Sequence, residues 1–201
     1  MAAPEALSRE KREAILDGAT RIFADRGYEG ASMSMITAAA GVSKGTIYQH
    51  FGGKAALFGA TIGRECEQRL VHLFATLDDS RDVAETLHSI GTRFLSMLTD
   101  PAIVAVERAV ASEAERFPEL AQAFFASGPA RAIGAMARYL KSQAEVGRLR
   151  IPDAPFAAEQ FFSLCQTRVV LRTRLRLPVP AGEAERVIDE AVRVFLAAYT
   201  A

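Results

Sequence analysis

Side chains that commonly carry enzymatic or metal chemistry are scarce in this chain of 201 residues. It has three histidines, His50, His72 and His88, and none of the motifs of common hydrolases, phosphate-binding loops or dinucleotide-binding folds. Its two cysteines, Cys66 and Cys165, show no CxxC or metal spacing, which favours reduced thiols, with redox sensing as an alternative. We therefore expect a protein that is not an enzyme and that uses no cofactor and no metal.

Long apolar runs and an excess of one charge are also missing. No apolar stretch approaches the roughly 20 residues that span a membrane, although 50% of the residues are hydrophobic, which is enough for a core. Residues 1–5 show no basic segment followed by an apolar stretch, so no signal peptide is expected. The 24 basic and 24 acidic residues cancel, which excludes a global attraction to nucleic acid. This composition predicts a cytoplasmic protein with no membrane partner.

Helical periodicity is abundant, whereas strand patterns are scarce, and this predicts an all-α fold. Ser8 is expected to cap the first helix and Gly27 to end it. The remaining boundaries follow from prolines, glycines and caps. The predicted helices are 8–26, 32–40, 43–51, 54–76, 83–98, 101–116, 118–127, 129–146, 153–175 and 183–199. The length and these boundaries predict a small N-terminal domain of three helices over residues 1–58 and a larger helical domain over residues 59–201.

Residues 39–51 carry the clearest local pattern. Apolar residues at helical spacing stop at Gly41, which can take a positive φ and close a helix. Ser43 can then cap a second short helix whose buried face holds Ile47 and Phe51. The opposite face presents polar and aromatic side chains, namely Lys44, Thr46, Tyr48, Gln49 and His50. This layout is typical of a helix-turn-helix whose second helix enters a DNA major groove, the alternative being a helical hairpin packed on another element.

Acidic side chains are absent from residues 30–64, where Lys44, Lys54 and Arg64 occur. A surface that approaches phosphates avoids carboxylates, because they would be repelled and left unpaired. Lys44, Thr46 and Gln49 have the chemistry to contact guanine acceptors, a thymine methyl and adenine, respectively. The local charge therefore supports DNA binding even though the whole chain is neutral.

Residues from about 9 to 58 resemble the DNA-binding domain of the TetR family of bacterial transcriptional regulators. The resemblance lies in Ile15-Leu16, Ala19, Ile22-Phe23, Arg26-Gly27-Tyr28, Ser32, residues 40–48, His50-Phe51, Lys54 and Leu57-Phe58. Ala31 and Thr37 depart from the family pattern, which often has Thr and Ala, respectively, at these places. Ala31 removes one phosphate-facing hydroxyl and leaves the capping to Ser32.

The resemblance implies roles for individual side chains. Tyr48, His50 and Lys54 are expected to contact phosphates, as are the backbone amides and hydroxyl of Ser32. A hydrophobic lid is the alternative for Tyr48, an ordinary surface histidine for His50, and Gly45 is expected to act through close packing. The expected DNA-binding residues are Ser32, Ser43, Lys44, Gly45, Thr46, Tyr48, Gln49, His50 and Lys54.

Segments further along the chain are similar to the C-terminal domain of AcrR- and AefR-like TetR regulators, which binds ligands and dimerises. The matching segments are 113–120 with Phe124, Gly128-Pro129, 147–149 and 157–161. The resemblance implies a small apolar or amphipathic effector held between helices. The candidate ligand-binding residues are Phe94, Met97, Leu98, Phe124, Phe125, Met136, Tyr139, Phe161, Phe162 and Cys165. The alternative, favoured residue by residue, is that they fill an ordinary core.

A homodimer is expected, because a helix-turn-helix protein that reads a near-palindromic site needs two recognition helices. Helices 153–175 and 183–199 are the candidate interface, since the last helix has an apolar face too wide for one flank. The expected interface residues are Leu164, Leu171, Leu175, Ile188, Val192, Phe195 and Leu196. Arg168, Arg172 and Arg176 are expected either to pair with Glu183 and Glu185 or to be solvated.

These observations and the resemblance together predict a transcriptional regulator. The expected partners are double-stranded operator DNA, a small effector and a second copy of the chain. The expected mode of action is that of a ligand-released repressor, with helix 54–76 as the transmitter. A constitutive DNA-binding protein, or an activator, is the alternative.

Overall fold

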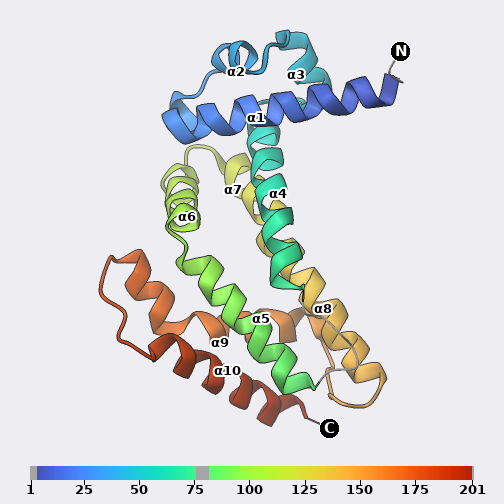
Figure 1. Ribbon diagram of the computed structural model, residues 1–201, viewed down its shortest axis with the longest axis vertical. Helices are drawn as coiled ribbons and strands as arrows, with labels where there is room; N and C mark the ends of the chain where they lie inside the picture. The colour runs from blue at the N-terminus through green and yellow to red at the C-terminus, as the bar shows by residue number, and fades with distance from the viewer. Residues whose placement is uncertain (1–3, 76–81, 201) are drawn as a thin grey trace. The chain divides into compact units, whose positions relative to one another are not determined.

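In a computed structural model, residues 4–75 and 82–200 are described, and over them the chain consists of helices joined by short connections (Figure 1). The helices are α1 (Pro4–Gly30), α2 (Met33–Ala40), α3 (Lys44–Phe51), α4 (Lys54–Leu73), α5 (Val83–Thr99), α6 (Pro101–Glu113), α7 (Pro118–Ser127), α8 (Pro129–Glu145), α9 (Ala154–Arg174) and α10 (Glu183–Tyr199). Leu149 and Thr200 form an isolated β-bridge. The predicted all-α fold is confirmed. Among the described residues, none of the helices combines the length and apolar character that crossing a bilayer requires.

Most predicted helix ends agree with the structure to within a few residues. The Ser8 cap is wrong, because α1 begins at Pro4 and Ser8 lies inside the helix. α6 ends at Glu113 instead of Arg116, and Phe117, which precedes Pro118, has an extended φ of −132°. A residue before proline avoids helical geometry, which keeps Phe117 out of both α6 and α7. α4 ends at Leu73, and the predicted end near Thr76 lies outside the described residues.

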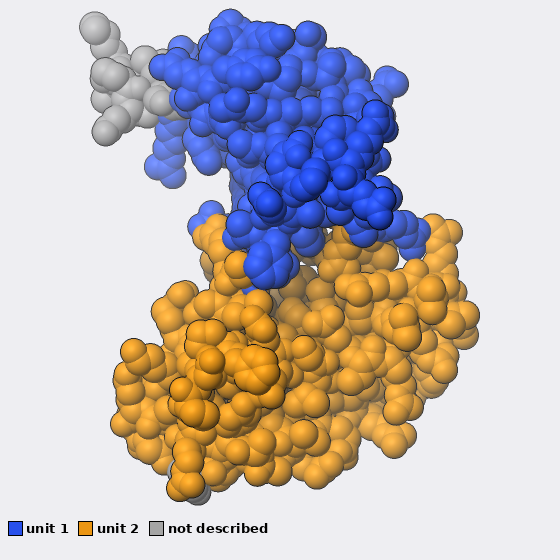
Figure 2. Space-filling view, turned by 180° about the vertical axis from the view of Figure 1, so that it is seen from behind, with its two compact units in different colours: residues 1–67, 108–129 blue, residues 68–107, 130–201 orange. Residues whose placement is uncertain are grey.

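The chain divides into two compact units (Figure 2). Residues 1–67 and 108–129 form unit 1, and residues 68–107 and 130–201 form unit 2. This packing differs from the predicted division at residue 58, since 59–67 and 108–129 join the N-terminal helices. The assignment of DNA binding to residues 1–58, and of ligand binding and dimerisation to residues 59–201, stays a prediction.

Unit 1 encloses a small core to which each of the first four helices contributes. The fully buried side chains of this core are Ile15, Leu16, Ala19, Ile36, Ile47 and Leu57. At its edge the Arg64 guanidinium of α4 lies 3.2 Å from a Glu13 carboxylate oxygen and 2.7 Å from one of Asp17. These ion pairs, together with the apolar burial, join α4 to α1.

Helix α7 packs on α4 within unit 1. A Cβ atom placed on Gly59 would lie 2.8 Å from the Ala123 Cβ, so the two helices approach closely at this glycine. The Ser127 hydroxyl donates a hydrogen bond of 2.9 Å to the Gly59 carbonyl. The small residues of α4 therefore explain why a segment far along the chain folds onto the N-terminal helices.

Unit 2 has its own core, made mainly by α5, α8, α9 and α10. Its largest fully buried side chains include Leu87, Ile90, Met136, Phe161 and Phe195. At Gly91 a Cβ would lie 3.2 Å from Cys165 Sγ and 3.3 Å from Ile188 Cγ2. α5 therefore needs a glycine where it meets both α9 and α10.

Helix α9 is interrupted at Thr167, which has φ 22° and ψ −136°. A positive φ is unfavourable for a β-branched residue, so the backbone is strained at this point. Just beyond it, Arg168 Nε lies 3.1 Å from a Glu183 carboxylate oxygen. Of the two alternatives for Arg168, the structure has the pairing with the start of the last helix, although 63% of the arginine side chain is exposed.

Candidate DNA-binding helix and effector domain

Helices α2 and α3 and the turn between them form a capped helix-turn-helix in unit 1 (Figure 1). Ser32 Oγ accepts a hydrogen bond of 3.2 Å from the Met35 amide, and Ser43 Oγ accepts one of 3.1 Å from the Thr46 amide. Gly41 closes α2 with φ 65°, in the left-handed region that favours glycine. The caps and the turn predicted for this segment are therefore present.

One face of α3 is buried and the other is exposed. Ile47 is fully buried in the core of unit 1, whereas Lys44, Gly45, Tyr48 and Gln49 are exposed. Thr46 and His50 are half-buried. Because 45% of Tyr48 is exposed, the alternative of a hydrophobic lid does not fit. The face predicted to meet DNA is thus open, and the roles of its individual residues stay predictions.

Several groups on this face are positioned by neighbours. The Ser43 and Thr46 hydroxyl oxygens are 2.8 Å apart and share a hydrogen bond. The Lys44 ammonium lies 5.9 Å from the centroid of the Tyr48 ring, at the outer range of a cation–π contact. The predicted phosphate ligand Lys54 is half-buried, and its ammonium donates a hydrogen bond of 3.2 Å to the Glu29 carbonyl.

Two arginines of α1 that sequence analysis missed also support the helix-turn-helix. The Arg12 guanidinium lies 5.4 Å from the Phe51 ring at the end of α3. Arg21 Nη2 donates a hydrogen bond of 2.9 Å to the Ala39 carbonyl in the last turn of α2. No local spacing signals these contacts, because each joins elements that are distant in the sequence.

Most of the predicted effector-binding side chains lie in the core of unit 2. Phe94, Leu98, Met136, Tyr139, Phe161, Phe162 and Cys165 are buried in that core, and Met97 packs against it half-buried. Phe125 departs from the prediction, because it is 55% exposed on α7 and belongs to unit 1 together with Phe124. Burial raises the pKa of the Cys165 thiol to about 12.

Aromatic rings link three helices of this core. The ring centroids of Phe94 on α5 and Phe162 on α9 are 4.3 Å apart. Phe161 lies 5.3 Å from Phe195 of α10, which in turn lies 4.8 Å from Tyr199. Such contacts stabilise the core.

The predicted dimer-interface residues fall into two groups. Ile188, Val192 and Phe195 are buried in the core of unit 2, so their assignment to an interface is wrong. In sequence they share an apolar helix face, but that face packs on α5 and α9 of the same protomer. Leu171 and Leu175 are 59% and 60% exposed, and Leu164 and Leu196 are half-buried.

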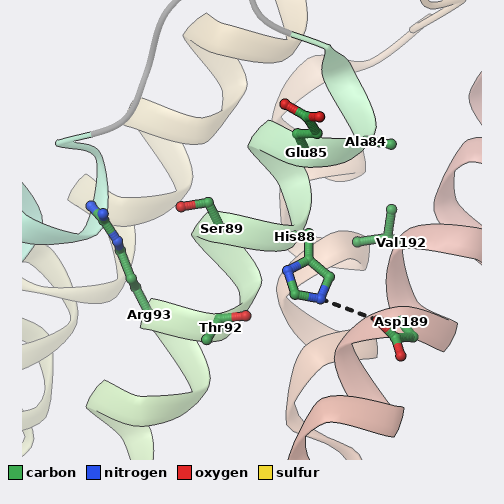
Figure 3. Close-up of a pocket in the computed structure, with 8 residues that line it drawn as sticks. All are labelled: Ala84, Glu85, His88, Ser89, Thr92, Arg93, Asp189 and Val192. Carbon is green, nitrogen blue, oxygen red and sulfur yellow. Dashed lines mark hydrogen bonds and ion pairs between the residues drawn. The ribbon is translucent and has the colours of Figure 1, made fainter.

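A separate surface groove of about 630 Å³ runs between α5 and α10 (Figure 3). In it, His88 of α5 extends toward α10, where its Nε2 lies 3.1 Å from Asp189 Oδ1. Ala84 and Val192 form apolar parts of the lining. His88, one of the three histidines of the chain, therefore lies in an open groove.

Comparison with known families gives two matches that together cover most of the chain. Residues 15–61 match the family described as bacterial regulatory proteins, tetR family. Residues 85–201 match the C-terminal domain of AefR-like transcriptional repressors. The chain is a member of the TetR family. The resemblance in the helix-turn-helix and the one in the C-terminal domain are both confirmed.

Individual TetR-family relatives are similar over different parts of the chain. The HTH-type transcriptional repressor AcnR of Corynebacterium efficiens is 48% identical over 59 residues, 29% of this chain and 31% of that protein. The HTH-type transcriptional activator FasR of Mycolicibacterium smegmatis is 33% identical over 89 residues, 44% of this chain and 41% of that protein. The chain thus spans less than half of the length of these two relatives.

A solved structure is similar to nearly the whole chain. The structure of the flavonoid-responsive regulator FrrA is 32% identical, with a TM-score of 0.78, over 94% of this chain and 97% of that one. The similarity therefore includes the larger, C-terminal part of the fold as well as the helix-turn-helix.

Proposed function

We propose that this TetR-family protein is a repressor that acts in the cytoplasm, binds a near-palindromic double-stranded operator as a homodimer and is released by a small effector. The observation that carries the proposal is the geometry of α3. Serine caps hold α2 and α3, Ile47 anchors α3 in the core, and the polar face with Lys44 and Gln49 is exposed. The repressor sense is supported by the name of the relative AcnR.

The exposed face of α3 divides into reading and positioning roles. Lys44, Thr46 and Gln49 meet base edges in the major groove, where amide and ammonium groups discriminate between bases. Tyr48, His50, Lys54 and the capped N-terminus at Ser32 contact phosphates, which supply affinity for any sequence. Ser43 acts through its cap, and Gly45 keeps the face of α3 free of a side chain.

The dimer forms through the outer surfaces of α9 and α10. Phe156, Leu171 and Val194 on these two helices, and Leu175 directly after α9, are exposed by 40–60%. A groove of about 490 Å³ between the helices is lined in part by Phe156, Leu164 and Val194. Large apolar side chains gathered on one surface favour burial against a partner. A two-fold contact of this kind presents two copies of α3 to a two-fold operator.

The effector is a mainly apolar molecule with aromatic character, bound within unit 2. The linked rings of Phe94, Phe161 and Phe162 support this proposal. FrrA, similar over nearly the whole chain, is named for its response to flavonoids. Helix α4 is the transmitter, because it contributes Leu57 to the core of unit 1 and Leu73 to the core of unit 2.

An operator shift assay with DNA from upstream of the protein's own coding sequence tests the proposal. Binding that is lost on addition of a flavonoid or another planar aromatic compound supports a ligand-released repressor. Coupling of this kind typically amounts to about 1–3 kcal/mol, or roughly 5–150-fold in operator affinity. Met97→Ala should change the effector response more than the operator affinity measured without effector, since Met97 is half-buried and packs against the core that contains the aromatic rings.

Two other experimental outcomes would indicate a different function. Operator affinity that no aromatic compound alters, despite direct binding of that compound, would identify a constitutive DNA-binding protein. Increased transcription from the bound promoter would identify an activator, the sense in which the relative FasR is named. Absence of binding to any DNA would contradict all three.

A further inference from the structure

The Lys54 side chain is held in place by the C-terminal end of α1. Its ammonium donates to the Glu29 carbonyl at 3.2 Å and lies 4.5 Å from the centroid of the Tyr28 ring. Burial lowers the pKa of Lys54, and the nearby carboxylates of Glu29 and Glu113 oppose that shift. An ammonium has three N–H donors, so the bond to Glu29 leaves donors for a phosphate oxygen.

Tyr28 is itself held by aromatic rings from α4 and from the turn between α6 and α7. It is 7% exposed, and its ring centroid lies 5.4 Å from that of Phe58 and 5.3 Å from that of Phe117. Phe117 precedes α7, in the turn that follows α6. The ring beneath the Lys54 ammonium is therefore held by a segment from a remote part of the chain that folds into the same compact unit.

The same turn also controls the charge beside Lys54. The Arg116 guanidinium donates a hydrogen bond to, and forms an ion pair with, the Glu29 carboxylate. The guanidinium carbon of Arg116 lies 5.2 Å from the centroid of the Phe117 ring, so the two residues of the turn pack together. Without this pairing, an uncompensated carboxylate would remain close to a group that has to meet a phosphate.

We propose that the α6–α7 turn positions Lys54 for DNA, with Phe117 holding the Tyr28 ring and Arg116 neutralising Glu29. Phe117 and Arg116 are positioning residues that need not touch DNA. A side chain already held in its binding geometry loses less conformational freedom when it meets a phosphate. The inference rests on the proposed operator binding and on the phosphate role of Lys54, and it adds the residues that make that contact effective.

A double-mutant cycle on operator affinity tests the role of Phe117. Phe117→Leu should weaken binding to all DNA sequences by about threefold or more, the size expected for coupled neighbours. Its salt dependence should stay unchanged, because the number of phosphate contacts is the same, whereas Lys54→Ala should lower the slope by about one. In the Lys54→Ala background, Phe117→Leu should have no further effect, since the group that it positions is gone.

Removing the Arg116 charge, and then removing the Glu29 charge that it neutralises, tests the role of Arg116. Arg116→Ala should weaken operator binding, Arg116→Lys should retain most of it, and adding Glu29→Gln to Arg116→Ala should restore it. Phe125→Leu is the matched control for Phe117→Leu, because Phe125 lies on the adjacent helix α7 and is 55% exposed. It should leave affinity and thermal stability unchanged.

The outcomes separate this inference from the proposed function. Equal losses from Phe117→Leu with and without Lys54 would assign Phe117 a purely structural role and overturn the inference alone. Failure of Glu29→Gln to restore binding would overturn the role of Arg116. Wild-type protein that bound no operator DNA would overturn the proposed function, and the inference would fall with it.

Discussion

A Cβ atom placed on Gly18 of α1 would lie 2.9 Å from the backbone nitrogen of Ala40 in α2. The two helices therefore meet with almost no side chain between them at the last turn of α2. Because that turn leads through Gly41 to α3, this close approach positions the recognition helix relative to the core.

The first prediction is that Gly18→Ala destabilises unit 1. The added methyl group would press on the backbone of Ala40, which a side-chain rotation cannot relieve, so we expect a loss of about 1–3 kcal/mol in the free energy of unfolding. Urea denaturation measures it, and operator affinity should fall as well. Gly134→Ala on α8 is the control, because its Cβ would lie 3.7 Å from a flexible Arg138 side chain. That variant should be neutral or slightly more stable, since alanine is the better helix former.

The second prediction separates base reading from phosphate binding. Gln49→Ala should change the relative affinities for operators that differ in one base pair, by about 1–3 kcal/mol at that position. Tyr48→Ala should instead weaken binding to all sequences alike. Titrations against a set of single-base operator variants distinguish the two patterns. A uniform loss for Gln49→Ala would remove this residue from the reading face.

The third prediction concerns the dimer. Leu175→Glu should convert the dimer to a folded monomer, because Leu175 is 60% exposed within one protomer and would bury a carboxylate only at the interface. Phe195→Glu should instead unfold unit 2, because Phe195 is 1% exposed inside the core. Sedimentation gives the mass and circular dichroism the helical content of each variant. An unchanged dimer for Leu175→Glu would place the interface on another surface.

The fourth prediction concerns the buried thiol. The pKa of Cys165 is raised by burial from 9.0 to about 12, so this cysteine should be protonated and unreactive toward a disulfide reagent at pH 8. In a Cys66→Ser variant the native protein should show no reactive thiol, and the urea-unfolded protein should show one. The Cys165 thiol ionises at lower pH in the unfolded protein than in the folded one. The contribution of Cys165 to the free energy of unfolding should therefore fall as the pH rises from about 9 toward 12. Rapid labelling of the native Cys66→Ser variant would contradict the burial of Cys165.

Sequence patterns predicted the helices and the helix-turn-helix because these depend on neighbouring residues. Ser32, Gly41 and Ser43 act through hydrogen bonds and backbone angles within a few residues, and the structure contains each of these features. The buried position of Ile47 follows from the helical period in the same way. The end of α6 was missed, because the predicted helix ran on through residues 114–116, which form a turn in the structure.

Only the tertiary structure shows which apolar residues are buried and which remote segments are in contact. Phe195 and Leu175 both lie on apolar helix faces in the sequence, but only the packing of α5, α9 and α10 separates the core residue from the exposed one. The contact between Tyr28 and Phe117 joins α1 to the turn before α7, far along the chain. Hydrophobic burial is not directional, so neither segment encodes its partner in its own sequence. The sequence by itself therefore determined the helices and the exposed polar face of α3 that we propose for DNA binding. Only the tertiary structure decided which residues fill the two cores and which segment holds Lys54 in place.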